Sequence, residues 1–336
     1  MKTKKNCREM KLIILLAITA AMIYGCTVST TKSATKGGCT MKKKLDIRVM
    51  GARRYFLLHL PQGYNPDRKI PLVIVLHGAF STPVQMEKQT GFSTLSDKFD
   101  FLVAYPSGAY GLFGYLKHWN AGHCCGKAAK DNLDDVGFLL AVMDDIQAQF
   151  PFDTSRVYMV GFSNGGMLTY RFAAEYPDRL AAAAVLGAAI GGQADAETPL
   201  WMPPKPAFPL PLIVFHAKDD QNVPYDGGIS PRKRGERTYT PVAQAIDFWV
   251  KNNHCPDEPR TETLCRDQVT KTKCADPVHD NDIELYTMDK WGHRWPGRYF
   301  TSRLSQEDPL KDFAFEQIIW SFFQNRHRQT NSLLSR

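Results

Sequence analysis

The 336-residue sequence lacks several features that would each indicate a different class of protein. It has no Cys-x-x-Cys pair, which argues against a structural zinc site. It has no internal repeat and no break in composition that would require a second domain. Its N-terminal apolar run, residues 12–24, is too short to be assigned as a membrane span. What remains is an ordinary globular composition, in a chain long enough to bury one large core.

The residues after the N-terminal segment also lack an excess of positive charge, although the whole chain carries a net charge of +8. Residues 1–44 contain ten Lys and Arg and one acid, a balance of +9, so the remaining residues sum to about −1. The basic character therefore belongs to the N-terminal leader and gives no support to a nucleic-acid-binding surface. We expect no nucleic acid among the partners of this protein.

The N-terminus has the pattern of an export signal. Basic residues precede the apolar run 12–24, as the charged region of a secretory signal precedes its apolar region. The run ends before Cys26 in a pattern that resembles a bacterial lipobox, although Tyr24 stands where a small residue is usual. We expect a lipoprotein signal over residues 1–25 with lipid on Cys26, and an ordinary cleaved signal peptide is the alternative. Either signal would export the domain to the periplasm or the extracellular space, and the lipid would anchor it to a bacterial membrane.

Removal of this leader leaves six cysteines besides Cys26, in a compartment where disulfides persist. The sequence does not choose among the fifteen pairings that six cysteines allow. Adjacent Cys124 and Cys125 are expected to pair with different partners rather than with each other. A local bridge between Cys265 and Cys274 is one candidate pairing.

The order of strands and helices indicates the fold class. Continuous apolar segments such as residues 71–77 are typical of buried parallel strands, and they alternate with helical segments. This alternation predicts an α/β protein with a doubly wound, mostly parallel sheet and helices on both faces. The expected strands are residues 47–50, 54–60, 71–77, 101–105, 157–160, 212–216 and 283–288, the first two as an antiparallel pair. The expected helices are residues 132–150, 167–176, 240–253 and 310–325.

Three stretches lie outside this alternation. Residues 26–44 are rich in Ser, Thr, Lys and Gly, which suits a flexible tether before the folded domain. That domain is expected at 45–326, followed by a polar tail at 327–336. Residues 194–211 contain six prolines and are expected to form an irregular loop, either a lid above the strand ends or a plain connection.

The segment Gly161-Phe162-Ser163-Asn164-Gly165 carries the strongest functional signal. It lies between a predicted strand and a predicted helix, where a serine hydrolase has its nucleophile elbow. The turn is so tight that flanking side chains would clash, and glycine at both places relieves this. The bare Gly-x-Ser-x-Gly pattern is weak evidence, since it arises by chance in roughly one chain in ten of this length. The strand, the helix and suitable partners make Ser163 the expected nucleophile.

A serine nucleophile needs a histidine to take its proton and a carboxylate to orient that histidine. In α/β-hydrolases the acid and then the histidine follow the serine along the chain. Asp219 and Asp220 follow the strand 212–216, and on this reasoning both remain candidates for the acid. His293 follows the strand 283–288 in a glycine-flanked loop, so it is the expected base. The later histidines that lack such a position are His254, His279 and His327.

An oxyanion hole requires two backbone N–H groups aimed at the developing charge. The first is expected from Asn164, directly after the nucleophile and at the positive end of its helix. The second is expected from the loop after the strand 71–77, from Ala79 with Phe80 as the alternative. Four further polar residues are interpreted as structural, as loop braces or helix caps: His77, His216, Asp134 and Asp135.

In combination these segments resemble one known family. The motifs are His77-Gly78, Trp119-Asn120 with Cys124-Cys125, Asp134-Asp135-Val136, Gly161-Phe162-Ser163-Asn164-Gly165-Gly166-Met167, Asp220-x-x-Val223-Pro224-Tyr225 and Gly292-His293-x-Trp295-Pro296-Gly297. Over about residues 45–325 the chain resembles the polyhydroxybutyrate depolymerase-like esterases, which include feruloyl and acetylxylan esterases of carbohydrate esterase family 1. The resemblance implies an α/β-hydrolase fold, Asp220 as the acid, and Trp295 and Trp119 at the substrate pocket. The chain departs from the family at His216-Ala217-Lys218, where His-Gly-Thr is usual.

The resemblance and the motifs together predict an exported serine ester hydrolase that acts on polymer-linked esters. The mechanism requires neither a metal nor an organic cofactor. The aromatic loop 110–115 would suit a phenolic acyl group, so feruloyl or acetyl esters of plant polysaccharide are the expected substrates. Polyhydroxybutyrate oligomers are the alternative substrate. Two more distant alternatives are a serine peptidase and an exported binding lipoprotein that kept the fold without catalysis.

Overall fold

The computed structural model describes residues 41–49, 51–111, 116–232, 236–255, 258–275 and 280–328. All of these residues belong to one compact unit, Thr40–Arg336. The predicted signal, Cys26, the tether before residue 41, His279 and the tail from residue 329 lie outside the described residues. Within the described ranges, no helix is both long and apolar enough to cross a bilayer.

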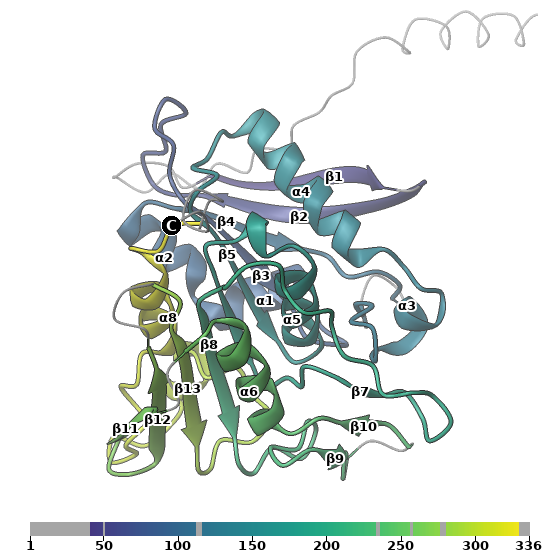
Figure 1. Cartoon of the computed structure of the whole chain (residues 1–336). Coiled ribbons are helices and arrows are strands. Elements are labelled where there is room, and N and C mark those ends of the chain that lie inside the picture. Colours follow the sequence, from purple (N-terminus) through teal and green to yellow (C-terminus); the bar gives the residue numbers. More distant parts are fainter. Residues whose placement is uncertain are drawn as a thin grey trace, which may run out of the picture. The chain divides into compact units, whose positions relative to one another are not determined.

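The centre of the described chain is a ten-stranded sheet (Figure 1). Its strands are β1 (Met41–Val49), β2 (Ala52–Leu60), β3 (Leu72–Leu76), β4 (Leu102–Pro106), β5 (Val157–Phe162), β6 (Ala182–Leu186), β8 (Leu212–Ala217), β11 (Arg260–Leu264), β12 (Val269–Cys274) and β13 (Ile283–Met288). Their order across the sheet is β1-β2-β4-β3-β5-β6-β8-β13-β12-β11. The strands from β4 to β13 are mutually parallel, and an antiparallel pair flanks them at each edge.

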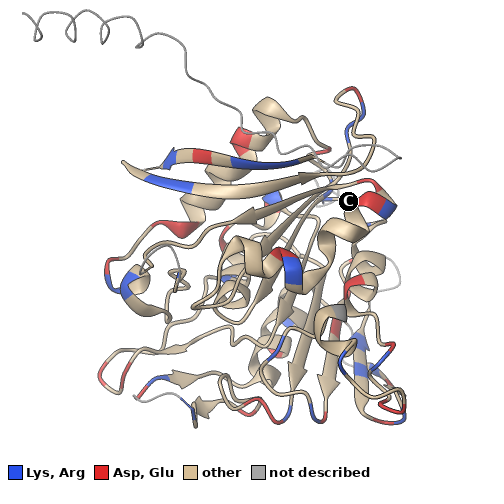
Figure 2. Cartoon of the chain, turned by 180° about the vertical axis from the view of Figure 1, so that it is seen from behind, with Lys and Arg blue, Asp and Glu red and all other residues tan. Residues whose placement is uncertain are grey.

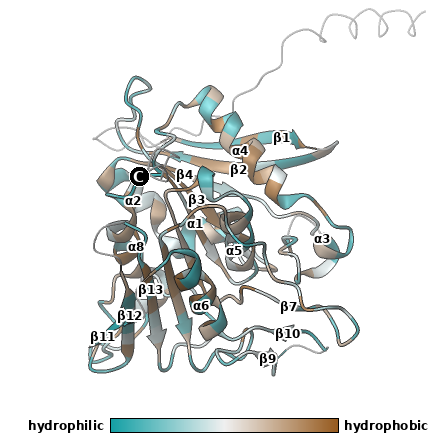
Figure 3. Ribbon diagram, in the orientation of Figure 1, coloured by the Kyte–Doolittle hydropathy of each residue, from teal (hydrophilic) through white to brown (hydrophobic). Residues whose placement is uncertain are grey.

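Helices cover both faces of this sheet. In strand β3, Leu72, Ile74 and Leu76 face one hydrophobic core, whereas Val73 and Val75 face the other. The first core includes residues of α4 (Asp135–Gln149), α5 (Asn164–Glu175) and α6 (Val242–Asn252). The second includes residues of α1 (Pro83–Thr90), α2 (Phe92–Phe99) and α8 (Phe315–Phe323). Figure 3 shows the apolar residues concentrated in the central strands, as burial between two helical layers requires.

The predicted doubly wound, mostly parallel sheet is confirmed, although strands β6, β11 and β12 were not predicted and the limits of other elements differ. Strand β1 begins at Met41, within the predicted tether. The strand extends through a lysine-rich sequence because its inward-facing positions are half-buried, and the Lys43 ammonium lies 4.4 Å from the centre of the Phe150 ring. Helix α8 begins at Phe315, later than predicted, after turns at residues 308–312. Figure 2 shows Lys and Arg interspersed with Asp and Glu over the described ribbon, as the small net charge outside the leader predicts.

Three short strands form a second sheet from the connections that leave the main sheet. These are β7 (Gly192–Gln193), β10 (Thr238–Tyr239) and β9 (Gly228–Ile229), in that order across the sheet. Strand β7 follows β6, and the other two follow β8, so all three arise beyond the carboxyl ends of parallel strands (Figure 1). Residues 194–211 are irregular apart from an isolated bridge between Trp201 and Gly192, as predicted. Their role as a lid stays a prediction.

Both expectations about cysteine pairing are wrong in this structure. Cys124 and Cys125 form a disulfide with each other. Cys265 and Cys274 form no disulfide with each other, because they lie at opposite ends of strand β12, one in the turn before it and one at its last residue. Sequence spacing alone did not show that a whole strand separates these two cysteines.

Two shorter helices and a 3₁₀ turn complete the described elements. Helix α3 (Gly126–Lys130) directly follows the disulfide, and α7 (Arg298–Thr301) follows the segment that carries His293. The 3₁₀ turn Pro177–Arg179 connects α5 to β6. The segments that precede α3 and α7 therefore contain the disulfide and His293, respectively.

Candidate active site

Ser163 lies at the tight turn between strand β5 and helix α5. Its backbone has φ 54° and ψ −123°, a left-handed conformation that a residue with a side chain rarely adopts. A Cβ added at Gly161 would lie 2.3 Å from the Gly165 carbonyl oxygen, and one at Gly165 would lie 2.5 Å from the His77 carbonyl oxygen. Both positions therefore exclude any side chain. The two glycines allow the strained turn that presents Ser163 at the carboxyl end of β5.

Ser163, His293 and Asp220 form a continuous hydrogen-bonded chain. His293 Nε2 lies 2.8 Å from Ser163 Oγ, and His293 Nδ1 lies 2.6 Å from Asp220 Oδ2. Asp220 follows strand β8 and His293 follows strand β13, which neighbour each other in the sheet. Because β5, β8 and β13 are parallel, their carboxyl ends meet at one edge and bring the three residues together. The expected order of serine, acid and histidine thus corresponds to a real spatial arrangement.

The Asp220 carboxylate is held by backbone groups as well as by His293. Its Oδ1 accepts hydrogen bonds from the N–H groups of Asn222 and Val223, at 2.8 and 2.9 Å. Burial alone would raise the pKa of this carboxyl, but the hydrogen bond from His293 and the Val223 N–H outweigh burial, so the pKa lies below its ordinary value. Asp220 is therefore a carboxylate at neutral pH, with its second oxygen directed to the histidine.

Asp219 has a different position, although the sequence left it open as the acid. Its Oδ1 accepts hydrogen bonds from the N–H groups of Trp291 and Gly292, at 2.9 and 2.7 Å. These residues immediately precede His293, so Asp219 supports the loop that carries the histidine. The two adjacent aspartates therefore have different roles. Asp220 bonds to the His293 ring, whereas Asp219 bonds to the backbone of the two residues that precede His293.

The two other buried histidines near the site bond to backbone groups. The His77 ring lies 2.8 Å from the Gly78 carbonyl through Nδ1 and accepts from the Gly108 N–H at 2.9 Å through Nε2. Burial lowers the pKa of His77 to about 4, so the ring is neutral at pH 7. His216 donates from Nε2 to the Val223 carbonyl at 2.8 Å, and burial lowers its pKa as well. These contacts agree with the prediction that both histidines are structural.

The backbone geometry distinguishes between the two candidates for the second oxyanion donor. The Asn164 N–H is the first in helix α5, so it has no acceptor within the helix. The Phe80 N–H donates to the Lys117 carbonyl at 2.9 Å and is therefore occupied. Ala79 makes no such bond among the described residues. The arrangement therefore favours Ala79 over Phe80 as the partner of Asn164.

The two tryptophans that the resemblance places at the substrate pocket are buried. Trp119 is 0% exposed and Trp295 is 1% exposed. Trp295 packs edge-on against Phe92 and Phe162, with ring centres 6.4 and 6.3 Å apart. Large aromatic side chains commonly pack in a core in this way. Contact of either tryptophan with a substrate stays a prediction.

A buried ion pair beside the site was missed by the sequence reasoning. Arg54 Nη1 lies 2.5 Å from Asp135 Oδ1, and Arg54 Nη2 donates to the Ser107 carbonyl at 2.9 Å. Asp134 alone caps helix α4, by accepting from the Gly137 N–H at 2.7 Å. The sequence did contain a signal for this ion pair, because only one of two adjacent aspartates can cap a helix. With Asp134 as the cap, Asp135 needs a partner elsewhere in the chain.

The chain is similar in sequence to several known proteins. Residues 54–199 match the family model described as esterase PHB depolymerase. NocK of Nocardia uniformis subsp. tsuyamanensis, which carries the name of an esterase, is 27% identical over 275 residues, covering 77% of this chain and 75% of that protein. Feruloyl esterase B of Piromyces equi is 30% identical over 249 residues, covering 71% of this chain. The chain spans only 42% of the length of that feruloyl esterase.

The fold is also found in solved structures. A carbohydrate esterase family 1 ferulic acid esterase from Anaeromyces mucronatus superposes with a TM-score of 0.53 and 14% identity, covering 88% of this chain and 93% of that one. At this identity the likeness concerns the fold. The family match over residues 54–199, the relatives and the fold together confirm the resemblance predicted from the motifs: the chain is similar to esterases of the PHB depolymerase type and has the fold of the α/β-hydrolase esterases.

Proposed function

We propose that the protein is an exported serine carboxylic ester hydrolase in which Ser163, His293 and Asp220 are the catalytic triad. The observation that carries this proposal is the unbroken hydrogen-bonded chain from Ser163 Oγ through the His293 ring to Asp220. The nucleophile elbow and the esterase relatives support the same reaction class. The substrates that we propose are ester groups attached to polymers or their fragments.

In the proposed reaction, His293 Nε2 takes the proton of Ser163 Oγ while Oγ attacks the ester carbonyl carbon. Asp220 keeps the other ring proton on Nδ1 and stabilises the imidazolium that forms. The N–H groups of Asn164 and Ala79 stabilise the tetrahedral oxyanion. His293 then donates its proton to the leaving alcohol, and the acyl group remains on Ser163. A water molecule, deprotonated by His293, attacks the acyl carbon, the bond from that carbon to Ser163 Oγ breaks, and His293 returns the proton to Oγ as the acid product leaves.

Feruloyl and acetyl esters of plant polysaccharide are the substrates that we prefer. Supporting this preference, relatives of the chain are named as feruloyl esterase and as acetylxylan esterase. The aromatic loop 110–115 is the sequence feature that would suit a phenolic acyl group, although residues 112–115 lie outside the described structure. Oligomers of polyhydroxybutyrate are the second candidate, because the matched family model is that of PHB depolymerase.

We further propose that the enzyme is exported and attached to a bacterial membrane through lipid on Cys26. The basic segment, the apolar run 12–24 and the lipobox-like pattern support this part of the proposal. Polymers are too large to enter a cell, so an exported enzyme would meet them where they occur. No nucleic acid, metal or organic cofactor takes part in the proposed reaction.

The deciding experiment compares the purified protein with its Ser163→Ala variant. The substrates are p-nitrophenyl acetate and butyrate, methyl ferulate, acetylated xylan and hydroxybutyrate oligomers. We expect hydrolysis by the native protein and loss of at least roughly 10⁴-fold in kcat with the variant, at an unchanged thermal midpoint. The fastest substrate then identifies the polymer class.

A fluorophosphonate probe provides the control for this comparison. The probe should label Ser163 in the native protein and leave Ser163→Ala unlabelled. If the folded native protein neither reacts with the probe nor hydrolyses the activated acetate, the esterase proposal is wrong and a binding protein is favoured. If it cleaves peptide amides faster than every ester, the peptidase alternative is favoured.

A further inference from the structure

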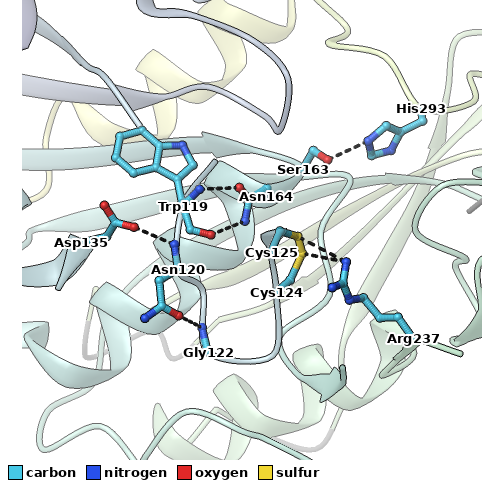
Figure 4. Close-up of a disulfide and its surroundings, with 10 residues drawn as sticks. All are labelled: Trp119, Asn120, Gly122, Cys124, Cys125, Asp135, Ser163, Asn164, Arg237 and His293. Carbon is cyan, nitrogen blue, oxygen red and sulfur yellow. Dashed lines mark hydrogen bonds between the residues drawn. A yellow bond between two sulfur atoms is a disulfide. The ribbon is translucent and has the colours of Figure 1, made fainter. Parts of the chain in front are cut away.

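A buried loop, Trp119–Cys125, contacts Asn164, the residue of the first proposed oxyanion donor (Figure 4). The Trp119 N–H donates to Asn164 Oδ1 at 2.8 Å, and the Trp119 carbonyl accepts from Asn164 Nδ2 at 3.0 Å. The Asn164 side chain therefore directs both of its polar atoms to one residue of this loop. Since the Asn164 backbone N–H is the first proposed donor, the loop fixes the residue that supplies it.

The same tryptophan also reaches the second donor. Trp119 Nε1 donates to the His77 carbonyl at 2.8 Å, and the two rings lie 4.9 Å apart. His77 precedes Ala79 by two residues, in the loop that follows strand β3. The indole thus bonds to the start of one oxyanion segment while the backbone of the same residue holds the other. Both segments are therefore bonded to a single buried residue, one through its side chain and one through its backbone.

The disulfide between Cys124 and Cys125 lies at the C-terminal end of the loop. The Cys125 N–H donates to the Trp119 carbonyl at 3.1 Å, and the Ala121 N–H donates to the Cys124 carbonyl at 2.5 Å. Arg237 Nη1 lies 3.5 and 3.7 Å from the two sulfur atoms. Figure 4 shows the Arg237 side chain directed at the disulfide. Arg237 comes from the segment directly before strand β10, so the second sheet contacts the loop at the disulfide.

The second residue of the loop is bonded to buried charged groups. The Asn120 N–H donates to Asp135 Oδ2 at 2.6 Å, and the Asn120 carbonyl accepts from Arg171 Nη1 at 3.1 Å. Asp135 is fully buried and paired with Arg54, so its position is determined by a charged partner on strand β2. A carboxylate fixed in this way cannot move without leaving a buried charge unpaired. The loop is therefore held at its first two residues and at its end.

We propose that the Trp119–Cys125 loop is a positioning device for the oxyanion hole, with Trp119 as its central positioning residue. This inference rests on the proposed esterase function. Oxyanion donors act only when they are aimed at the position that the developing negative charge will occupy. The Trp119 contacts set the separation of the Asn164 and Ala79 segments. Loss of these contacts should weaken stabilisation of the transition state and leave binding of the ester in its ground state unchanged.

The test compares Trp119→Phe with Trp249→Phe in the purified full chain. Trp119→Phe keeps a buried aromatic ring but removes the N–H that bonds to His77. Trp249 is equally buried, and its indole nitrogen has no hydrogen-bond partner among the described residues, so Trp249→Phe is the matched control. With p-nitrophenyl acetate, kcat of Trp119→Phe should fall roughly 10- to 100-fold while KM stays within about twofold. The control should keep the native kcat.

A second readout separates positioning from general loss of structure. Phenylboronic acid forms a tetrahedral adduct with a catalytic serine and therefore imitates the transition state. Its affinity should fall with Trp119→Phe by about the same factor as kcat, whereas inhibition by the product alcohol should not change. An unchanged kcat and boronate affinity in folded Trp119→Phe would overturn the inference. Equal losses in both tryptophan variants would also overturn it.

Asn164→Asp keeps the inference testable if Trp119→Phe does not fold. This variant keeps the backbone N–H and an oxygen to accept from Trp119, but it loses the amide that donates to the Trp119 carbonyl. A lower kcat at unchanged KM supports the inference, and a native kcat contradicts it. Failure of the esterase proposal is recognised separately, because the native protein would then show no Ser163-dependent hydrolysis at all.

Discussion

The carboxyl edge of the sheet and the β1–β2 hairpin at its border use polar residues in different ways. At the carboxyl edge, Asp220 and Asn164 are buried and direct their polar atoms to named backbone or ring partners. In the hairpin, Arg53 and Asp46 pair with each other at the surface, with side chains 69% and 43% exposed. A partner lost at the buried edge leaves a polar group without water, whereas water replaces a partner lost at the hairpin. Substitutions should therefore be costly at the carboxyl edge and tolerated at the hairpin.

The largest expected difference lies within the carboxyl edge itself, between two adjacent aspartates. Asp220→Asn removes the carboxylate that keeps the His293 proton on Nδ1, so kcat should fall by roughly 10⁴-fold. Asp219→Asn keeps an oxygen that can accept from the Trp291 and Gly292 N–H groups, so kcat should fall by less than about tenfold. Steady-state kinetics with p-nitrophenyl acetate measures both. Equal losses in the two variants would contradict the assignment of Asp220 as the sole acid.

The next largest effect is a difference in stability between a glycine variant in the elbow and a glycine variant in the hairpin. Gly165→Ala would place a Cβ 2.5 Å from the His77 carbonyl oxygen and 2.6 Å from that of Leu76. Since both contacts are with backbone, the free energy of unfolding should fall by roughly 3 kcal/mol or more. Gly51 has a positive φ of 80° but open space around it, so Gly51→Ala should cost only about 1 kcal/mol. Urea unfolding of the two variants measures the difference.

A third effect is a dependence of stability on pH that arises from His77. Burial lowers the pKa of this ring to about 4, against an ordinary value of 6.5, so between these values the unfolded chain binds a proton that the folded chain does not. The stability that the neutral ring contributes is complete above pH 6.5 and is lost as pH falls towards 4. From pH 7 to pH 5 this loss amounts to ~2 kcal/mol.

His77→Gln is the variant that isolates this contribution, because glutamine keeps a donor and an acceptor without titrating. Its free energy of unfolding should be lower than that of the native protein at pH 7, and the difference should shrink at pH 5. Urea unfolding at the two pH values measures it. The same difference at both pH values would show that His77 is not the group responsible.

Structural features that depend on hydrophobic periodicity and on the order of residues along the chain could be predicted from the sequence. Features that depend on which residues are neighbours in space could not. The buried strands and the nucleophile elbow could be predicted from local sequence pattern. The order of Ser163, Asp220 and His293 could be predicted as well, because each of these three residues follows a strand of the parallel sheet. The position of Trp119 does not follow from local pattern, since its partners Asn164 and His77 are about 40 residues away in either direction. The pairing of Cys124 with Cys125 was missed for a different reason, because two adjacent cysteines were expected to reach different partners.

The smallest expected effect is at the hairpin, with Arg53→Ala. The Arg53–Asp46 pair joins the two strands of the β1–β2 hairpin at a distance of 2.9 Å, but both side chains are in contact with water. Its Coulomb attraction is screened, and ordering two long side chains opposes it. The urea midpoint and kcat should therefore stay within the reproducibility of the measurements. Arg54→Met, one residue along the same strand, should by contrast destabilise the fold and lower kcat, because Arg54 is the buried partner of Asp135. If Arg53→Ala and Arg54→Met had the same urea midpoint and the same kcat, burial would not explain the difference between the hairpin and the carboxyl edge.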